Sequence, residues 1–274
     1  MQVVILAGGF GTRISEESQY KPKPMIEIGG MPIIIHIMKW YAKYGYNDFI
    51  ICAGYKQEKI KEYFSNFAIN TAKSVTFPAY GDNTKSAMGT FSRFGYNPKL
   101  DGVDHIFEKF NIQVVDTGVG TFTGGRLKQI APYINGDRFL MTYGDGLCDV
   151  NINKLYEQHI NSNAKVTLTG ILPESRYGTL EINEANQVLS FREKSKMDSN
   201  WINGGFMVME KSSLDYIVGD VMFEHGPLQK LFKDGYLYCY KHSGNWACMD
   251  TLRDKERLEA EWATGKAFWS YDYE

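Results

Sequence analysis

The sequence predicts an α/β protein built on a Rossmann-like, doubly wound sheet that is mixed but mostly parallel. Two observations predict it: short apolar runs ending in glycine turns alternate with amphipathic helical segments in the first half, and strand-like alternation dominates the second half. A chain of 274 residues without a visible repeat or linker suits a single domain over 1–274 with a β-rich elaboration in its second half.

The elements of the first half follow in order. The run "VVILA" (3–7) is a buried parallel strand that ends at a glycine turn. Pro32 opens a helix whose apolar residues recur at helical spacing, and Gly45 ends it. Residues 69–111 show no clear period, so we expect a long loop there. The remaining strands are expected at 48–55, 111–118 and 138–146, and the remaining helices at 57–67 and 124–134.

The second half begins with a helix at 151–162 and a strand at 165–172. Residues 177–194 alternate around a polar turn, which is typical of a β-hairpin. A further strand is expected at 202–210, and the charged segment 251–265 is expected to close the chain as a helix.

Composition excludes several functional classes. The chain is 43% hydrophobic and 23% charged with a net charge of −2, so it has no global field that would attract nucleic acid or anionic lipid. It contains no apolar run long enough to span a bilayer and no signal peptide, so we expect a cytoplasmic protein that does not bind membranes. Its four cysteines form no C-x-x-C pair, which argues against a zinc site, and Cys52 and Cys148 lie in or beside apolar runs as buried thiols.

The segment "LAGGFGTRISEESQYKPKPM" (6–25) predicts an anion site. A glycine turn after a strand lets backbone N–H groups converge on a phosphate. A dinucleotide site is disfavoured because Ile14 stands where G-x-G-x-x-G needs glycine, and a P-loop is disfavoured because no Lys-Ser or Lys-Thr follows the glycines. A purely structural turn stays open for the glycines alone. The residues expected to bind phosphate and sugar through this turn are Leu6, Ala7, Gly8, Gly9, Gly11 and Thr12.

Two cations favour a nucleoside triphosphate over a bare turn. Arg13 directly follows the turn, and Lys23 stands between two prolines that restrict the backbone and so place the ammonium group. Together with the glycines they predict a triphosphate site.

This combination resembles the signature of the sugar-1-phosphate nucleotidylyltransferases, G-G-x-G-T-R-L followed by P-K-P-[ML], with Ile14 in place of leucine. Later segments narrow the resemblance to the glucose-1-phosphate cytidylyltransferases, and it runs nearly end to end. These segments are "IEIGG", "DFIICAGYK", "VDTG", "TGGRLK", "TYGDG", "INGGF" and "MDTLRD". The resemblance implies that 1–150 mainly binds the nucleotide and 151–274 mainly binds the acceptor.

The implied reaction joins CTP to a sugar 1-phosphate and releases pyrophosphate, for nucleotide-sugar and polysaccharide biosynthesis. It is catalysed by positioning and by cations, with Arg13, Lys23 and Asp145 as the implied catalytic residues. The resemblance implies that Asp145 and Asp250 hold Mg²⁺, a hard ion that takes one or two carboxylates and substrate phosphates. Taken alone, Asp145 could equally be a turn aspartate, and Asp250 could be a helix N-cap or an acid beside the positive end of the helix dipole.

The resemblance also implies contacts to both substrates. Thr121, Gly125 and Arg126 would recognise the base and close over the nucleotide, and Gly144 would approach its sugar; Arg126 could also be an exposed residue of a first helical turn. On the acceptor side the family's Glu-Lys pair falls on Glu193 and Lys194, followed here by Ser195 instead of proline. Trp246 could stack on the acceptor or belong to the core. The remaining acceptor contacts would be Gly178, Asn203 and Gly204.

The stretch 80–110 departs from the family pattern, so the base, the acceptor and the oligomeric state stay open at this point. Another NTP (dTTP, UTP or GTP) and a different, even non-sugar, phosphate acceptor are alternatives. A non-catalytic nucleotide-binding module is a third, disfavoured by the presence of both Asp145 and Asp250. The family resemblance implies a homo-oligomer.

Overall fold

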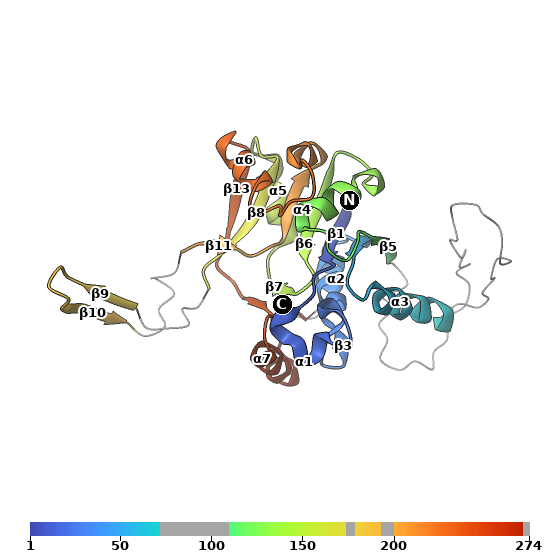
Figure 1. Cartoon of the computed structure of the whole chain (residues 1–274), viewed down its shortest axis with the longest axis horizontal. Helices are drawn as coiled ribbons and strands as arrows, with labels where there is room; N and C mark the ends of the chain where they lie inside the picture. The colour runs from blue at the N-terminus through green and yellow to red at the C-terminus, as the bar shows by residue number, and fades with distance from the viewer. Residues whose placement is uncertain (72–109, 174–178, 193–199, 271–274) are drawn as a thin grey trace.

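A computed structural model describes residues 1–71, 110–173, 179–192 and 200–270. Its centre is an eight-stranded mixed sheet with the order β11-β8-β12-β6-β1-β4-β5, and β13 pairs with β8 (Figure 1). This confirms the predicted Rossmann-like mixed sheet. The strands are β1 (Gln2–Ala7), β4 (Asp48–Ala53), β5 (Asn111–Asp116), β6 (Arg138–Tyr143), β8 (Val166–Ile171), β11 (Ile202–Asn203), β12 (Met207–Glu210) and β13 (Leu237–His242).

The parallel core of the sheet places the glycine turn. β1 lies between β4 and β6 and is parallel to both, with Leu6 opposite Cys52 and Tyr143. β4 is in turn parallel to β5. Because parallel strands end at the same edge of a sheet, the segments that follow β1, β5 and β6 gather at that edge.

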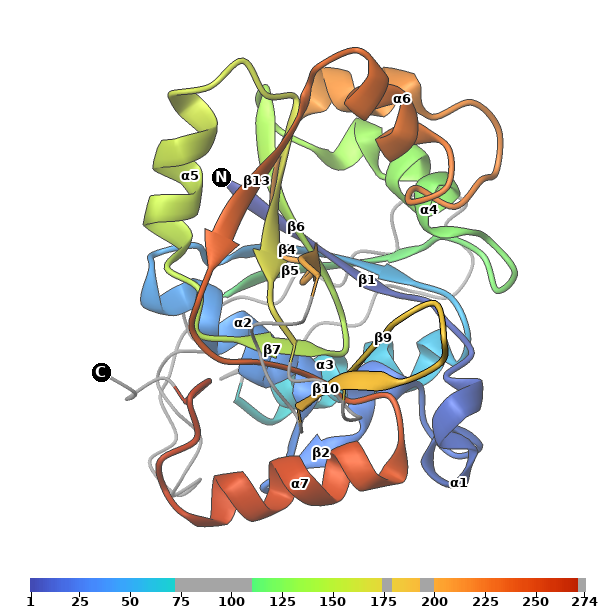
Figure 2. The same cartoon turned by 90° about the vertical axis from the view of Figure 1, so that its left-hand side faces the viewer.

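Helices cover both faces of the sheet (Figure 2). Each face has its own apolar core. Strand β1 serves both, because Val3 and Ile5 point to one core while Val4 and Leu6 point to the other. The first core takes in α2 (Ile33–Lys43), α5 (Ile152–Ile160) and α7 (Leu252–Ala263). The second takes in α4 (Thr123–Gln129) and α6 (Pro227–Lys233). The other helices are α1 (Ser15–Ser18) and α3 (Gln57–Thr71).

Several predicted boundaries were wrong. Pro32 precedes α2 instead of opening it. The helix expected at 124–134 ends at Gln129 and a short 3-10 turn (Ala131–Tyr133) follows, because Pro132 lacks the N–H that would continue it. The single strand expected at 202–210 is divided into β11 and β12 at Gly204–Phe206, where Gly205 and Phe206 both have positive φ.

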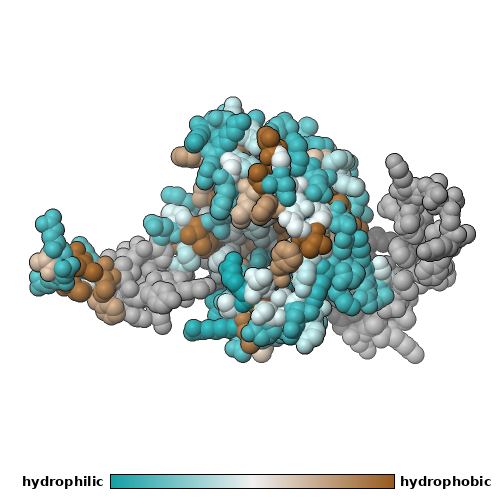
Figure 3. Space-filling view, in the orientation of Figure 1, coloured by the Kyte–Doolittle hydropathy of each residue, from teal (hydrophilic) through white to brown (hydrophobic). Residues whose placement is uncertain are grey.

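The β-rich second half is present, but most of its strands extend the main sheet. The expected hairpin is β9 (Thr179–Ile182) with β10 (Val188–Arg192), which pair with each other and lie apart from the sheet (Figures 1 and 3). Two small strand pairs were not predicted: β2 (Glu27–Ile28) with β3 (Met31–Pro32), and β7 (Gly146–Cys148) with β14 (Trp246–Cys248). Among the residues described, none of the helices has the length and apolar character needed to cross a membrane.

Candidate active site

A pocket of about 390 Å³ opens where β1 and β6 end. Lys23 and Pro24 line it beside these strand ends, and Thr121 and Arg126 line it from the segment around α4. Its lining contains nearly every residue expected to bind the nucleotide or the metal. These are Leu6, Ala7, Gly8, Gly9, Gly11, Thr12, Arg13, Lys23, Thr121, Arg126, Gly144, Asp145 and Asp250.

Two glycines of the turn are required by its geometry. Gly11 has a φ of 66°, a left-handed conformation that side chains disfavour. A Cβ on Gly8 would lie 2.1 Å from Nη1 of Arg126, so only glycine lets the guanidinium pack there. The turn is also fixed to β6, because the Gly144 amide donates to the Leu6 carbonyl at 2.9 Å.

Arg126 is buried, which excludes the alternative that it is an exposed residue in the first turn of the helix. Its guanidinium donates to the carbonyls of Gly8 at 3.0 Å and Gly118 at 2.8 Å. It also donates to Oγ1 of Thr117 at 2.7 Å. The residue therefore ties the glycine turn to the loop that follows β5, and it fixes the wall of the pocket.

Four charged side chains meet at the mouth of the pocket. Nζ of Lys23 lies 2.7 Å from Oδ2 of Asp145 and 2.6 Å from Oδ1 of Asp250. Arg13 reaches the other oxygen of Asp250 at 2.8 Å from an otherwise exposed position. The two cations and the two acids come from distant parts of the chain, and their formal charges cancel.

Backbone pairing brings the two acids together. In the β7–β14 ladder Cys248 lies opposite Gly146, the residue after Asp145, and the Met249 amide donates to the Asp145 carbonyl at 3.0 Å. Asp250 is not the N-cap of α7. That position belongs to Thr251, which forms a capping box with Asp254, so the Asp250 carboxylate faces Lys23 and Arg13 instead.

The ion pairs shift the pKa of two of these groups. Burial alone would lower the pKa of Lys23, but the charge and hydrogen bonds of Asp145 and Asp250 outweigh burial and raise it. Burial alone would raise the pKa of Asp250, but Lys23 and Arg13 outweigh burial and hold it below its usual range. Both groups are therefore charged at neutral pH.

The predicted acceptor residues that the structure describes lie together beside this cluster. The Trp246 indole N–H donates to the Gly204 carbonyl at 2.9 Å, so β14 is bonded to the turn that contains Asn203. The Asn203 amide donates to the Tyr143 hydroxyl at 3.4 Å, and that hydroxyl donates to Glu224 at 2.6 Å. Tyr143 lines the pocket, so these hydrogen bonds connect the pocket wall to the turn that contains Asn203.

Sequence reasoning missed Tyr143 and Glu224. Tyr143 directly precedes "GDG" at the end of β6, and the end of a parallel strand is a position where a ligand-binding side chain is expected. Glu224 lies in an irregular segment before α6, and it also accepts a hydrogen bond of 2.7 Å from the Thr123 hydroxyl. Nothing in the sequence around Glu224 signals these long-range contacts.

Asn203, Gly204 and Trp246 lie outside the pocket lining, and four further predicted residues are not placed in the pocket either. Gly125 does not line it, because the glycine faces the Asp220 side chain, where a Cβ would lie 2.1 Å from the carboxylate. Gly178, Glu193 and Lys194 lie outside the described residues.

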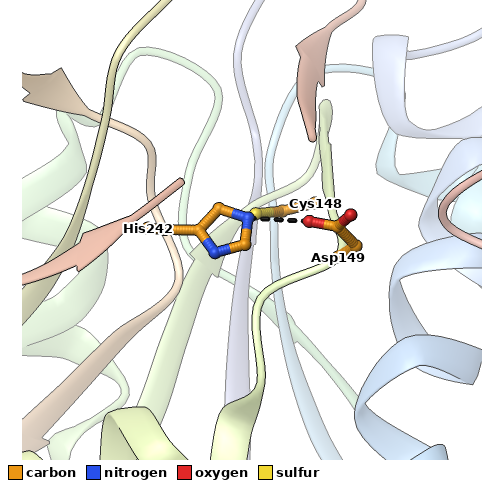
Figure 4. A group of neighbouring side chains, drawn as sticks. All are labelled: Cys148, Asp149 and His242. Carbon is orange, nitrogen blue, oxygen red and sulfur yellow. Dashed lines mark hydrogen bonds and ion pairs between the residues drawn. The ribbon is translucent and has the colours of Figure 1, made fainter. Parts of the chain in front are cut away.

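A second group of side chains, Cys148, Asp149 and His242, brings S, O and N atoms within 4.8 Å of one another (Figure 4). Its carboxylate already has three hydrogen-bond partners within the protein. Oδ1 of Asp149 is 2.7 Å from Nε2 of His242 and accepts from the Asn245 amide at 2.8 Å, while Oδ2 accepts from the Asn245 side chain at 2.8 Å. These bonds fasten the loop before β14 to the end of β7, so the group anchors the strand that leads to Asp250.

Comparison with known proteins identifies the family of this chain. The family model described as nucleotidyl transferase matches residues 2–251. The chain belongs to the nucleotidyl transferase family. It is 46% identical to the glucose-1-phosphate cytidylyltransferase of Salmonella typhi, with 98% of each chain covered. It is 40% identical to the probable glucose-1-phosphate cytidylyltransferase of Bacillus subtilis, with 98% of this chain and 99% of the relative covered.

Solved structures share the fold of this nucleotidyl transferase. HddC from Yersinia pseudotuberculosis superimposes with a TM-score of 0.64 at 23% identity, over 95% of this chain and 99% of that chain. The inositol-1-phosphate CTP transferase from T. maritima gives 0.60 at 15% identity, over 94% of each chain. Nucleotidyl transferases generally use a divalent metal ion.

Proposed function

We propose that this nucleotidyl transferase joins CTP to glucose 1-phosphate and releases CDP-glucose and pyrophosphate. The near full-length identity to glucose-1-phosphate cytidylyltransferases supports the substrates. The observation that carries the chemistry is the meeting of Lys23, Arg13, Asp145 and Asp250 at the mouth of the glycine-turn pocket. Anionic substrates need such a concentration of placed charges more than they need a general base.

In the proposed reaction a phosphate oxygen of glucose 1-phosphate attacks the α-phosphorus of CTP in line. A new P–O bond forms, the bond from the α-phosphorus to the bridging oxygen breaks, and pyrophosphate leaves with the electron pair. The attacking oxygen is already an anion, so no proton has to be removed. Lys23 and Arg13 would bind the triphosphate and stabilise the charge that develops on it.

Asp145 and Asp250 fit a divalent ion, which we propose is Mg²⁺. Their carboxylates converge on one point, since both lie within 2.7 Å of the same ammonium nitrogen, and carboxylate oxygen is the ligand that Mg²⁺ prefers. When bound, the ion supplies positive charge that neutralises and orients the phosphates. The carboxylates of Asp145 and Asp250 would hold the ion and fix its position in the pocket.

The turn and its neighbours would bind the nucleotide. Gly8, Gly9, Gly11 and Thr12 would approach the phosphates, and Gly144 would approach the ribose. The Arg126 guanidinium donates its hydrogen bonds to backbone carbonyls and to the Thr117 hydroxyl. We therefore propose that Arg126, together with Thr121, shapes the pocket for the base.

The acceptor would lie beside Asn203, Gly204 and Trp246, which the hydrogen bond from Trp246 to Gly204 holds together. Gly178, Glu193 and Lys194 stay predictions for this side of the site, and so does Gly125 for the nucleotide side. The division into a nucleotide-binding half (1–150) and an acceptor-binding half (151–274) also stays a prediction.

We further propose a homo-oligomer in the cytoplasm. The β9–β10 hairpin exposes Leu180, Ile182, Val188, Leu189 and Phe191, each at least half exposed, and Figure 3 shows apolar side chains gathered on it. A second copy of the chain would remove them from water. Sedimentation velocity of the wild type and of a Leu189→Lys variant tests this proposal.

Pyrophosphate release tests the function. The protein is incubated with Mg²⁺ and each of CTP, dTTP, UTP and GTP, against glucose 1-phosphate and a panel of other phosphorylated acceptors. We expect release with CTP and glucose 1-phosphate. Release with another pair would move the assignment to that pair, and no release with any pair would favour a nucleotide-binding module.

A further inference from the structure

A thiol lies beside the two acids of the candidate metal site. Sγ of Cys248 and the carboxylate oxygens of Asp145 and Asp250 all lie within 4.8 Å of one another. The thiol also donates a hydrogen bond to Asp250, and this bond is one of the causes that lower the pKa of that carboxyl group.

The backbone fixes this position. Successive side chains of a strand point to opposite sides, so Trp246 and Cys248 share one side of β14, and Asp250 follows two residues later. The same ladder sets Cys248 opposite Gly146, next to Asp145. Cys248 is only half-buried, so an ion that reaches the carboxylates can also reach the sulfur.

We propose that Cys248 is a third ligand of this site for thiophilic divalent ions such as Co²⁺, Zn²⁺ and Cd²⁺. The inference rests on the proposed metal-binding role of Asp145 and Asp250. Mg²⁺ takes oxygen ligands, so with Mg²⁺ the thiol stays a neutral hydrogen-bond donor to Asp250. Thiolate prefers softer ions, so the same three residues form an S,O,O set for them.

Binding such an ion breaks the S–H bond, forms a sulfur–metal bond and releases the proton to solvent. An ion held by three protein ligands has fewer positions left for phosphate oxygens. Thiophilic ions should therefore bind tightly and inhibit turnover in competition with Mg²⁺.

Co²⁺ is the probe for the test, because a cobalt–thiolate bond gives a near-ultraviolet charge-transfer band. Reduced full-length protein is titrated with Co²⁺ in the absence of nucleotide. We expect the band in the wild type, its loss in Cys248→Ala and its bleaching by excess Mg²⁺. Co²⁺ affinity should fall at least about tenfold in Cys248→Ala.

Two matched control variants show whether the band comes from Cys248 or from another thiol. Cys239→Ala removes an exposed thiol and Cys148→Ala removes the thiol of the second group, and both should keep the band. A measurement on the wild type does not depend on how any variant folds. Cd²⁺ should protect Cys248 from alkylation, as read by mass spectrometry, and Mg²⁺ should not.

A wild type without the band, a band that survives Cys248→Ala, or one lost in Cys148→Ala would each overturn the inference. These outcomes differ from a failure of the proposed function. Pyrophosphate release with Mg²⁺ but no cobalt–thiolate band would reject the ligand role of Cys248 alone. A Cys248-dependent band without pyrophosphate release from any NTP would reject the enzymatic proposal alone.

Discussion

Replacing Lys23 by methionine should strengthen metal binding while it weakens catalysis. Nζ of Lys23 lies 2.7 Å and 2.6 Å from the two carboxylates that would hold the ion, so ammonium and ion compete for one position. A divalent ion that contacts both acids must displace the ammonium, whose natural next partner is a phosphate of the triphosphate. Without nucleotide, Lys23→Met therefore removes a competitor. With nucleotide, it removes a phosphate ligand.

The size of the gain follows from the charges. The carboxylates of Asp145 and Asp250 are about a quarter exposed (28% and 25%), so water reaches the site and the value for a water-like medium is a lower bound. At about 4 Å in a water-like medium two unit charges interact by about 1 kcal/mol. A divalent ion doubles this repulsion to roughly 2 kcal/mol, which corresponds to a roughly thirtyfold gain in affinity. Loss of the phosphate contact should lower kcat/KM by roughly 100-fold.

Electron paramagnetic resonance of free Mn²⁺ measures the first effect, and pyrophosphate release measures the second. Lys21→Met is the matched control, because Lys21 is two residues away and pairs with Glu27 at 2.9 Å instead of with the acids. It should leave Mn²⁺ affinity unchanged. If Lys23→Met binds Mn²⁺ no more tightly than wild type without nucleotide, the ammonium and the ion do not share a position, and the reasoning fails.

Three further substitutions test neighbouring parts of the site. Asp250→Asn should lower the free energy of unfolding by about 1 kcal/mol at neutral pH, as measured by urea unfolding. Because the pKa of Asp250 is depressed in the folded protein, the stability advantage of the wild type is present above the ordinary pKa of 3.8 and disappears as pH falls below it. A stability difference that does not depend on pH would contradict the ion-pair account. Arg126→Met leaves the Gly8 and Gly118 carbonyls without their donor, so melting temperature should fall and KM for CTP should rise, whereas an unchanged KM would separate Arg126 from the pocket wall. Trp246→Phe keeps a ring but loses the hydrogen bond to Gly204, so KM for glucose 1-phosphate should rise several-fold with KM for CTP constant, and the reverse pattern would put the acceptor elsewhere.

The sequence was most informative where local chemistry determines structure. The apolar run of β1, the glycines after it and the helical period of α2 each depend on neighbours in the chain, and the structure has all three elements in place. The convergence of Lys23, Asp145 and Asp250 was expected from the family resemblance. Taken alone, each acid had an equally good local explanation, and for Asp250 the Thr251 cap of α7 removes only the N-cap explanation.

Contacts that depend on tertiary packing could not be predicted. The β7–β14 pair has three residues in each strand, too few for a period, yet it sets the distance between the acids. Strand β13 was missed because its buried and exposed positions do not alternate. The burial of Arg126 depends on the carbonyls of Ala53 at the end of β4 and of Gly8 after β1, which nothing in "TGGRLK" reveals.

The short strand β14 has a consequence for how the two substrates influence each other. The indole of its first residue, Trp246, is bonded to the turn of Asn203 and Gly204, where we propose that the acceptor binds, and Asp250 follows only four positions later in the chain. The loop that leads into β14 is held by hydrogen bonds from Asn245 to Asp149, so the segment between Trp246 and Asp250 has little freedom to move. A sugar phosphate that displaces the Trp246 indole would therefore also shift the Asp250 carboxylate. Binding of the acceptor would in this way change the position of a group that contacts the nucleotide site.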